Sequence, residues 1–323
     1  MSNANRAIDP LIILHISDLH FGWDVDVKAN DERELALNGL LRKLATIDAD
    51  WKPNCVCLTG DIGWRGAKDD YVRAALWIEK LLGILEIEKE ALFLCAGNHD
   101  LDRSLARQNV RPHNSSEADR VLRIPVPKHY EDPFNEFTIF CRQMNCPPLM
   151  LGDTPNYLVG TREFRGVSFI ALNSAWFSQD EHDKGNLWLG LPLLKHLECS
   201  HQLSASETLH DGPICVAMLH HPKEYLSEAE FRAEDYGRQN TFDYLARRCH
   251  LILTGHTHGE VRRADRTAEA AWNLSGGAAY AGASHFNSFR LVRLENERLV
   301  YRSFEYDPRS ADNLWHRKIR QRR

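Results

Sequence analysis

Five short motifs rich in histidine, aspartate and asparagine occur along the chain, and each follows an apolar run. In chain order they are Asp18-Leu19-His20, Gly60-Asp61, Gly97-Asn98-His99-Asp100, His220-His221-Pro222 and Gly255-His256-Thr257-His258. Imidazole nitrogens bind zinc, manganese, iron or nickel, and carboxylate and amide oxygens bind harder cations. No thiolate belongs to the set, which argues against a structural zinc site. The motifs therefore predict a metal site of the catalytic kind.

The motifs offer seven good ligands, which is too many for one tetrahedral ion. They suit two ions that share a carboxylate. Ions about 3.5–4 Å apart clamp the attacking and leaving oxygens of an in-line displacement at phosphorus. Taken singly, the motifs have ordinary explanations: Gly60-Asp61 is typical of a turn, and Asn98 or Asp100 could cap a helix. The order of all five, each at a strand end, favours the metal site.

The apolar run before each motif predicts a buried strand. The five runs are residues 11–16, 54–59, 91–95, 214–219 and 251–254. Helical spacing of apolar residues follows the first two runs, at residues 30–44 and 69–82. Strands that alternate with helices predict βαβ units and a largely parallel sheet. Since open α/β sheets bind ligands beyond the carboxyl ends of their strands, we expect the motifs to meet at one edge.

Residues 101–156 are weakly patterned, with polar residues, prolines and one predicted helix at 134–144. A stretch of this length inside a compact domain is usually functional, so a lid or cap insertion is expected there. The remaining predicted elements are antiparallel strands at 157–160, 162–164, 167–172, 271–274, 288–295 and 299–306, helices at 187–199 and 241–248, and a frayed basic tail at 316–323. We expect a single domain over residues 1–323.

Composition excludes several classes of protein. The 323 residues are 43% hydrophobic and 26% charged, near the globular average, which excludes disorder and fibres. A formal net charge of -5 does not favour a general binder of nucleic acid or membranes. No apolar run reaches the roughly 18–20 residues of a membrane span, and the N-terminus does not read as a signal peptide. Eight scattered cysteines without a Cys-x-x-Cys pair suit a reducing cytoplasm.

In this order, the five motifs resemble those of the calcineurin-like metallophosphoesterase superfamily, over about residues 12–306. The resemblance implies an αββα sandwich, in which two mixed sheets pack together with helices outside. It also implies the metal ligands: Asp18, His20 and His258 for the first ion, Asn98, His220 and His256 for the second, and Asp61 as the bridge. His220 matches the family position, so His221 is expected to support the site from behind.

The resemblance implies that a hydroxide between the two metals attacks phosphorus. His99 is then expected to stabilise the transition state or to protonate the leaving oxygen, as imidazole chemistry near neutral pH allows. Manganese or iron is the expected pair of metals, and zinc or nickel would also accept these ligands. The substrate is expected to be a phosphate ester.

Two differences from the motifs of the phosphoprotein phosphatase branch bear on the choice of substrate. The phosphoprotein phosphatase branch resembles Gly-Asp-x-x-Asp-Arg-Gly in its second motif, whereas Trp64 stands at the position of the second aspartate, before Arg65 and Gly66. That branch ends its third motif in Glu, and this chain has Asp100. The Gly-His-Thr-His ending resembles the phosphodiesterase and nuclease branches. We therefore favour a phosphodiesterase for a cyclic nucleotide or nucleic acid. The alternatives are a phosphomonoesterase or protein phosphatase, and a non-catalytic regulatory module on the same fold.

Three further side chains are candidates for substrate binding. Arg65 could bind a phosphate oxygen bidentately, or be a surface arginine. Arg103 could reach the substrate, or pair with Asp102 at a helix start. Asn173 follows a predicted strand and could line the site, although asparagine there is commonly a turn former.

Aromatic and isolated histidine side chains give weaker signals. Trp23, Trp64 and Trp176 follow strand ends and could form an aromatic wall for a nucleobase, or be ordinary packing residues. His15 is expected in the core or behind the site, and His285 on a solvated loop.

Overall fold

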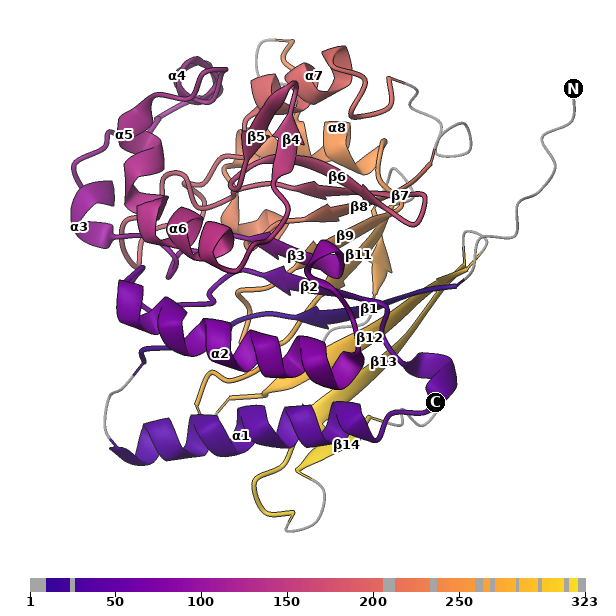
Figure 1. The fold of residues 1–323 in the computed structure, drawn as a ribbon. Helices are drawn as coiled ribbons and strands as arrows, with labels where there is room; N and C mark the ends of the chain where they lie inside the picture. The colour runs from indigo at the N-terminus through magenta and orange to yellow at the C-terminus, as the bar shows by residue number, and fades with distance from the viewer. Residues whose placement is uncertain are drawn as a thin grey trace, which may run out of the picture.

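Two mixed β-sheets pack face to face between two layers of helices (Figure 1). The computed structural model describes residues 10–23, 27–205, 213–232, 237–258, 264–267, 271–282, 285–295, 298–310 and 314–318. The helices α1 (Val27–Ala45) and α2 (Lys68–Leu85) cover one sheet, and α7 (Leu191–Cys199) and α8 (Thr241–Ala246) cover the other. The expected αββα class is confirmed.

The first sheet holds six strands in the order β14-β13-β12-β1-β2-β3. Their bounds are β1 Leu11–Ile16, β2 Cys55–Thr59, β3 Leu92–Cys95, β12 Ser288–Glu295, β13 Arg298–Tyr306 and β14 Trp315–Arg317. The strands β1, β2 and β3 are parallel, and β12 pairs antiparallel with both β1 and β13. The predicted tail therefore begins inside a strand, because His316 and Arg317 belong to β14; residues 319–323 lie outside the described part.

The second sheet holds eight strands in the order β10-β11-β9-β8-β7-β6-β4-β5. Their bounds are β4 Leu149–Leu151, β5 Thr154–Asn156, β6 Gly160–Phe164, β7 Val167–Ala171, β8 Ile214–Met218, β9 Leu251–Thr254, β10 Asp265–Arg266 and β11 Trp272–Ser275. The strands β7, β8, β9 and β11 are mutually parallel.

One strand prediction in this half was incomplete and one was wrong. The strand β11 pairs antiparallel with β10, as expected, and it also pairs parallel with β9. Residues 157–160 mostly form a bend, since Oδ1 of Asn156 accepts hydrogen bonds from the amides of Leu158 (2.7 Å) and Val159 (3.0 Å). This is an Asx turn, which competes with strand pairing.

Apolar side chains from both sheets fill the layer between them. Leu11 and Ile13 of β1 point into this layer, whereas Leu14 and Ile16 face the helices, as the alternation of a strand requires. The rings of Phe93 on β3 and Phe169 on β7 stack across the interface, with centroids 3.9 Å apart. This packing fixes the two sheets relative to each other, and with them the strand ends that carry the motifs.

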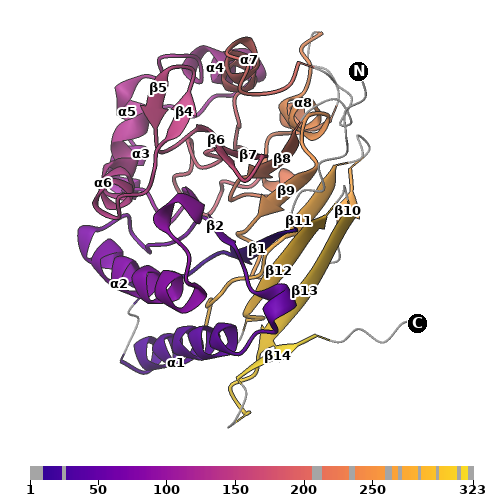
Figure 2. The same cartoon turned by 45° about the vertical axis from the view of Figure 1, so that its right-hand side comes forward.

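The segment 101–156 is more ordered than its sequence predicts. It forms α3 (Arg103–Ala106), α4 (Ser115–Val121), α5 (Lys128–Glu131) and α6 (Asn135–Gln143), followed by the strands β4 and β5. Only α6 was predicted, since the other three helices are too short to show a period. The ring of Phe140 stacks on Tyr71 of α2 with centroids 5.0 Å apart, which anchors α6 on the helix layer. Figure 2 shows α6 next to α2, with α3 and α5 above it and α4 near α7, along one side of the sandwich.

In the part of the chain that the structure describes, no helix is both long and apolar enough to cross a membrane.

Candidate metal centre

The five motifs meet where the parallel strands of both sheets end. Four groups of three side chains have ligand atoms within 4.8 Å of one another: Asp18, His20 and His258; Asp18, Asp61 and His220; His20, Asp61 and His99; and His220, His221 and His256. Six of the seven predicted ligands occur in these groups, and the seventh, Asn98, contributes an amide oxygen to the same cluster. The donors are two carboxylates, one amide and imidazoles, which fits divalent transition metals.

Asp18, His20 and His258 form one half of the cluster. Nε2 of His258 lies 3.1 Å from Oδ1 of Asp18 and 3.3 Å from Nε2 of His20. Asp18 and His20 are fully buried, so water does not compete for these atoms. These three side chains converge as the first-ion set requires.

Asn98, His220 and His256 form the other half. Nε2 of His220 lies 3.1 Å from Oδ1 of Asn98 and 3.2 Å from Nδ1 of His256. Oδ2 of Asp61 is 3.2 Å from the same Nε2 atom, and Asp61 also belongs to a group with His20. Asp61 therefore lies between the two halves, as a bridging carboxylate would.

His221 lies in direct contact with the cluster, in one group with His220 and His256. Its Nε2 is 3.2 Å from Oδ1 of Asn98, and its Nδ1 is 2.9 Å from Oγ of Ser174. The ring is thus oriented by the loop after β7 and directed at the second half of the cluster. It offers an eighth possible ligand beside His220.

Burial and neighbouring charge set the protonation of these groups. Burial lowers the pKa of His20 and of His256 to about 3, so both rings are neutral at neutral pH, as metal ligands must be. Burial alone would also lower the pKa of His220, but the Asp61 carboxylate outweighs it and raises that pKa to about 9. Without metal, His220 therefore carries a proton that an incoming ion must displace.

The backbone at the site adopts conformations that ordinary residues avoid. Asp18, His20, Asp61 and His256 have φ values of 56°, 48°, 54° and 67°, in the left-handed region. Such strain persists only where surrounding structure imposes it, and it is concentrated at functional sites. Close packing adds a further constraint, because a Cβ atom on Gly97 would lie 2.2 Å from Oδ1 of Asp61.

Two contacts that orient the ligands were not predicted. Nδ1 of His220 lies 2.7 Å from the carbonyl oxygen of Thr59, which leaves Nε2 directed at the cluster. Arg33, only 1% exposed, donates to the carbonyl oxygens of His20 (3.1 Å) and Trp23 (3.2 Å). The sequence signal for this contact was the position of Arg33 on the apolar face of α1, four residues before Leu37.

His99 lies beside the cluster with its ring against Trp64. The His99 amide donates to Oδ1 of Asp61 (2.8 Å), and Nδ1 of its ring lies 2.9 Å from the carbonyl oxygen of Trp64. The two rings stack, with centroids 3.9 Å apart and planes 11° apart. Trp23 stacks on Trp64 in turn, at 5.2 Å. Trp176 does not join this wall, because it is 2% exposed and packs against Phe134 in the core.

The three predicted substrate residues lie in different surroundings. Arg65 is exposed on the loop after Asp61. Arg103 is half-buried at the start of α3 and its charge acts on His99, whereas Asp102 accepts from the amide of Ser104 (2.8 Å) as the cap of that helix. Asn173 is 1% exposed, and its Oδ1 accepts from the amide of Ala175 (2.8 Å), which is the turn-forming alternative.

Two isolated histidines can also be placed. His15 is fully buried with its Nε2 2.9 Å from Oγ1 of Thr59, so the expected core position is confirmed. His285 is exposed, as expected, but its ring lies edge-on to His258 with centroids 5.7 Å apart.

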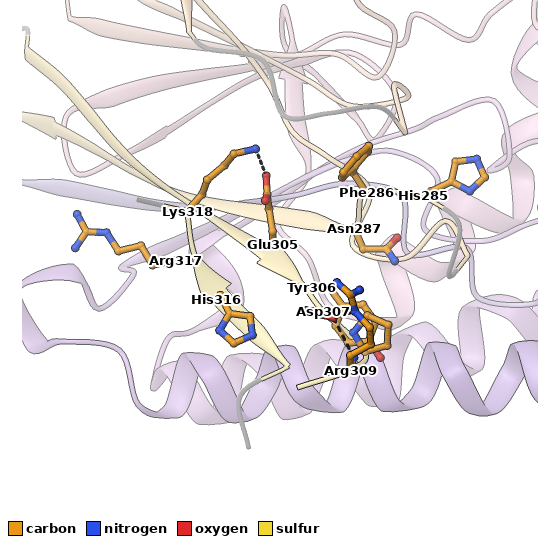
Figure 3. Close-up of a pocket in the computed structure, with 11 residues that line it drawn as sticks. His285, Phe286, Asn287, Glu305, Tyr306, Asp307, Arg309, His316, Arg317 and Lys318 are labelled. Atoms are coloured by element: carbon orange, nitrogen blue, oxygen red, sulfur yellow. Dashed lines mark hydrogen bonds and ion pairs between the residues drawn. The ribbon is translucent and has the colours of Figure 1, made fainter. Parts of the chain in front are cut away.

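His285 also borders a surface pocket of about 610 Å³, which the start of β12, the end of β13 and the strand β14 line. Figure 3 shows Phe286 and Asn287 on one side of this pocket and Lys318 paired with Glu305 on the other. In its lining Arg309 is paired with Asp307 at 3.1 Å, Arg317 adds positive charge, and Phe286 is 56% exposed.

The sequence matches the calcineurin-like phosphoesterase family over residues 11–260, so the chain belongs to that family. Members of this family are dinuclear metal-dependent proteins. Most hydrolyse phosphoric esters, and some are non-catalytic. No curated protein matches the sequence significantly.

Solved structures with a similar fold are distant in sequence. A dimetal phosphatase from Danio rerio is 12% identical, with 91% of this chain and 99% of that chain covered and a TM-score of 0.48. An archaeal phosphodiesterase is 9% identical, with 91% and 99% covered and a TM-score of 0.39. A serine/threonine phosphatase from Saccharomyces cerevisiae is 12% identical, with 93% and 82% covered and a TM-score of 0.39. At these sequence identities and TM-scores, the similarity gives no information about the activity of this chain.

Proposed function

We propose that this protein is a dinuclear metal-dependent phosphodiesterase that hydrolyses a nucleoside phosphodiester, either a cyclic nucleotide or a nucleic acid. The observation that carries the proposal is the position of Asp61, whose Oδ2 lies 3.2 Å from His220 while the same carboxylate belongs to a group with His20. A carboxylate shared by two sets of ligands is what a pair of ions requires. Manganese or iron is the proposed pair.

The ligands would be divided between two ions. Asp18, His20 and His258 would hold one, Asn98, His220 and His256 the other, with Asp61 common to both. When bound, such ions lower the pKa of water and neutralise charge on the phosphoryl oxygens. His221 would orient Asn98 from behind, through its 3.2 Å contact with the amide oxygen.

His99 would protonate the leaving oxygen. Its backbone N–H donates a hydrogen bond to Oδ1 of Asp61, which fixes the residue beside the shared carboxylate, and its Nδ1 contact with Trp64 leaves Nε2 for the substrate. General acid catalysis of this kind is worth about 10²–10⁴ in rate. Arg65 and Arg103, from the loop after β2 and the start of α3, would bind the phosphoryl oxygens. In this way the segment 101–156 would supply one wall of the site.

A nucleoside is favoured by the aromatic wall. Trp23 and Trp64 are half-buried, stack on each other at 5.2 Å, and both contact the ring of His20. Stacking of a base on such a side chain contributes about 1–3 kcal/mol. The pocket beside His285 would then receive the remainder of a longer substrate.

Hydrolysis of bis(p-nitrophenyl) phosphate and p-nitrophenyl phosphate by the manganese-loaded protein tests the proposal. A phosphodiesterase prefers the diester. Preference for the monoester would instead support a phosphatase, for which the Arg65-Gly66 pair of the second motif is the specific observation. Arg65→Gln would then be expected to weaken monoester binding most, with the exposed Arg165→Gln as its control.

The free thiols support a reducing compartment. All eight cysteines are free and seven of them are buried, so they pack as small apolar side chains. The cytoplasm is the proposed compartment.

A further inference from the structure

Within the residues that the structure describes, the partner of Nδ1 of the catalytic candidate His99 is a backbone carbonyl and not a carboxylate. Trp64 stands in the sequence where a related branch has an aspartate, and it meets His99 in two ways. Its carbonyl oxygen is 2.9 Å from Nδ1, and its indole ring lies 3.9 Å from the imidazole, with planes 11° apart. One residue therefore constrains both the tautomer and the plane of the His99 ring.

The loop that carries Trp64 is itself held in place. Oδ2 of Asp70, in the first turn of α2, accepts from the amides of Trp64 (3.2 Å) and Arg65 (3.1 Å). Asp70 is 6% exposed, and a Cβ atom on Gly22 would lie 1.8 Å from its Oδ1. The turn at Gly22 thus closes over Asp70 and leaves the loop little freedom.

The end of this loop, at Gly66, is also bound to His99. The amide of Gly66 donates to the carbonyl oxygen of His99 at 2.9 Å. With a φ of 60°, Gly66 makes the sharp turn that this bond needs, and a Cβ atom there would lie 2.6 Å from the backbone of Leu101. The backbone of His99 is therefore held by Gly66, and its ring is held by the carbonyl oxygen and the indole ring of Trp64.

We propose that Trp64 is the positioning residue of His99 and takes over the role of a carboxylate partner. This inference rests on the proposed function. The carbonyl holds a proton on Nδ1, and the indole fixes the ring plane, so Nε2 is the nitrogen that faces the ester. A carbonyl accepts this hydrogen bond without adding a negative charge to the site.

The proton balance follows from this arrangement. Water oxygen forms a bond to phosphorus as the ester P–O bond breaks. The leaving oxygen takes a proton from Nε2 of His99, and the ring keeps its other proton on Nδ1, against the carbonyl oxygen of Trp64. The attacking water passes its proton to solvent, and solvent returns one to Nε2.

The first test compares two thymidine esters that differ in the leaving group: thymidine 5′-(p-nitrophenyl phosphate) and the dinucleotide thymidylyl-thymidine. An alkoxide needs protonation far more than p-nitrophenolate does. Trp64→Leu is expected to lower kcat for the dinucleotide about 10-fold or more, a part of the full contribution of a general acid. The p-nitrophenyl ester should lose much less, and Trp64→Phe should restore most of the rate.

A double-mutant cycle separates action through His99 from other effects. If Trp64 acts through His99, Trp64→Leu/His99→Gln is no slower on the dinucleotide than His99→Gln alone. Trp23→Leu removes an equal ring from the same wall and should change KM rather than kcat. Equal losses for both esters, or additive effects in the cycle, would overturn the proposal.

A second readout needs no activity. Nitrogen-15 NMR of labelled histidine in the metal-free protein is expected to show His99 as the Nδ1–H tautomer, also in Trp64→Leu, because that variant keeps the backbone carbonyl that accepts from Nδ1. An Nε2–H tautomer in the unaltered protein would overturn the proposal. If Trp64→Leu does not fold, Trp64→Phe must keep the Nδ1–H tautomer. Failure of the metal-loaded protein to cleave either ester would count against the proposed function, and the tautomer would still decide the role of Trp64.

Discussion

His220 and Asp61 lie side chain to side chain across the two sheets, with Nε2 of the histidine 3.2 Å from Oδ2 of the aspartate. His220 follows β8 of the eight-stranded sheet, and Asp61 follows β2 of the six-stranded sheet. The metal centre is therefore complete only when the sheets are packed together. Binding of ions to the folded protein alone would stabilise it, by about 2.7 kcal/mol at 100 times the dissociation constant.

Replacement of the shared carboxylate is predicted to be the most damaging change. Asp61→Asn keeps the shape of the side chain but removes the charge common to both halves, so metal affinity should fall more than about 100-fold. Hydrolysis should fall in parallel. Calorimetric titration with Mn²⁺ measures the effect, and the exposed Asp69→Asn is the control. Unchanged affinity for Mn²⁺ in Asp61→Asn would contradict the assignment.

The adjacent histidines His220 and His221 are predicted to differ. His220→Ala removes a ligand and should lower metal affinity more than about 100-fold, whereas loss of a side chain that only orients a ligand costs about 10–100-fold. Ser174→Ala should resemble His221→Ala, because Ser174 fixes Nδ1 of that ring at 2.9 Å. Titration with Mn²⁺ compares the three variants. Equal losses in His220→Ala and His221→Ala would make both residues ligands.

Two glycines offer a matched pair of substitutions. Gly97→Ala places a Cβ atom 2.2 Å from Oδ1 of Asp61, so it should destabilise the fold by about 1–3 kcal/mol and weaken metal binding. Gly83 lies inside α2 with no atom within 4 Å of its added Cβ, so Gly83→Ala should stabilise by about 0.5–1 kcal/mol. Urea unfolding measures both. A stable, metal-binding Gly97→Ala protein would contradict the packing described here.

His15 is predicted to make the metal-free protein sensitive to acid. Burial, aided by the charge of Arg290, lowers the pKa of His15 to about 3, while the unfolded chain has a pKa near 6.5. Between these values the unfolded state binds a proton that the folded state does not, so stability falls as pH falls, by about 1.4 kcal/mol per pH unit. His15→Gln should lack this component. Urea unfolding at several pH values tests it, and identical slopes in the two proteins would refute it.

The sequence predicted that the candidate ligands would lie together, because the signal lies in side-chain type and in position after a strand. Asp18, Asp61 and His256 each follow a strand that apolar composition alone identifies. Parallel pairing brings Asp18 and Asp61 to one edge of the six-stranded sheet, and the packing of the two sheets adds His256. The same logic predicted β12 and β13, which are eight and nine residues long.

The supporting contacts could not be predicted in the same way. Thr59 and Trp64 contact His220 and His99 through backbone carbonyl oxygens, which any residue type would supply. The helices α3 to α5 have only four to seven residues each, which is too short for a helical period of apolar residues to show in the sequence. Trp176 resembled Trp23 in the sequence, and only packing against Phe134 separates them.

The most direct measurement titrates the metal-free protein with Mn²⁺ while following hydrolysis of bis(p-nitrophenyl) phosphate. A dinuclear centre predicts that activity appears with metal and reaches its plateau at two ions per chain, with none in Asp61→Asn. Full activity after chelation, or the plateau reached with a single ion, would contradict the account.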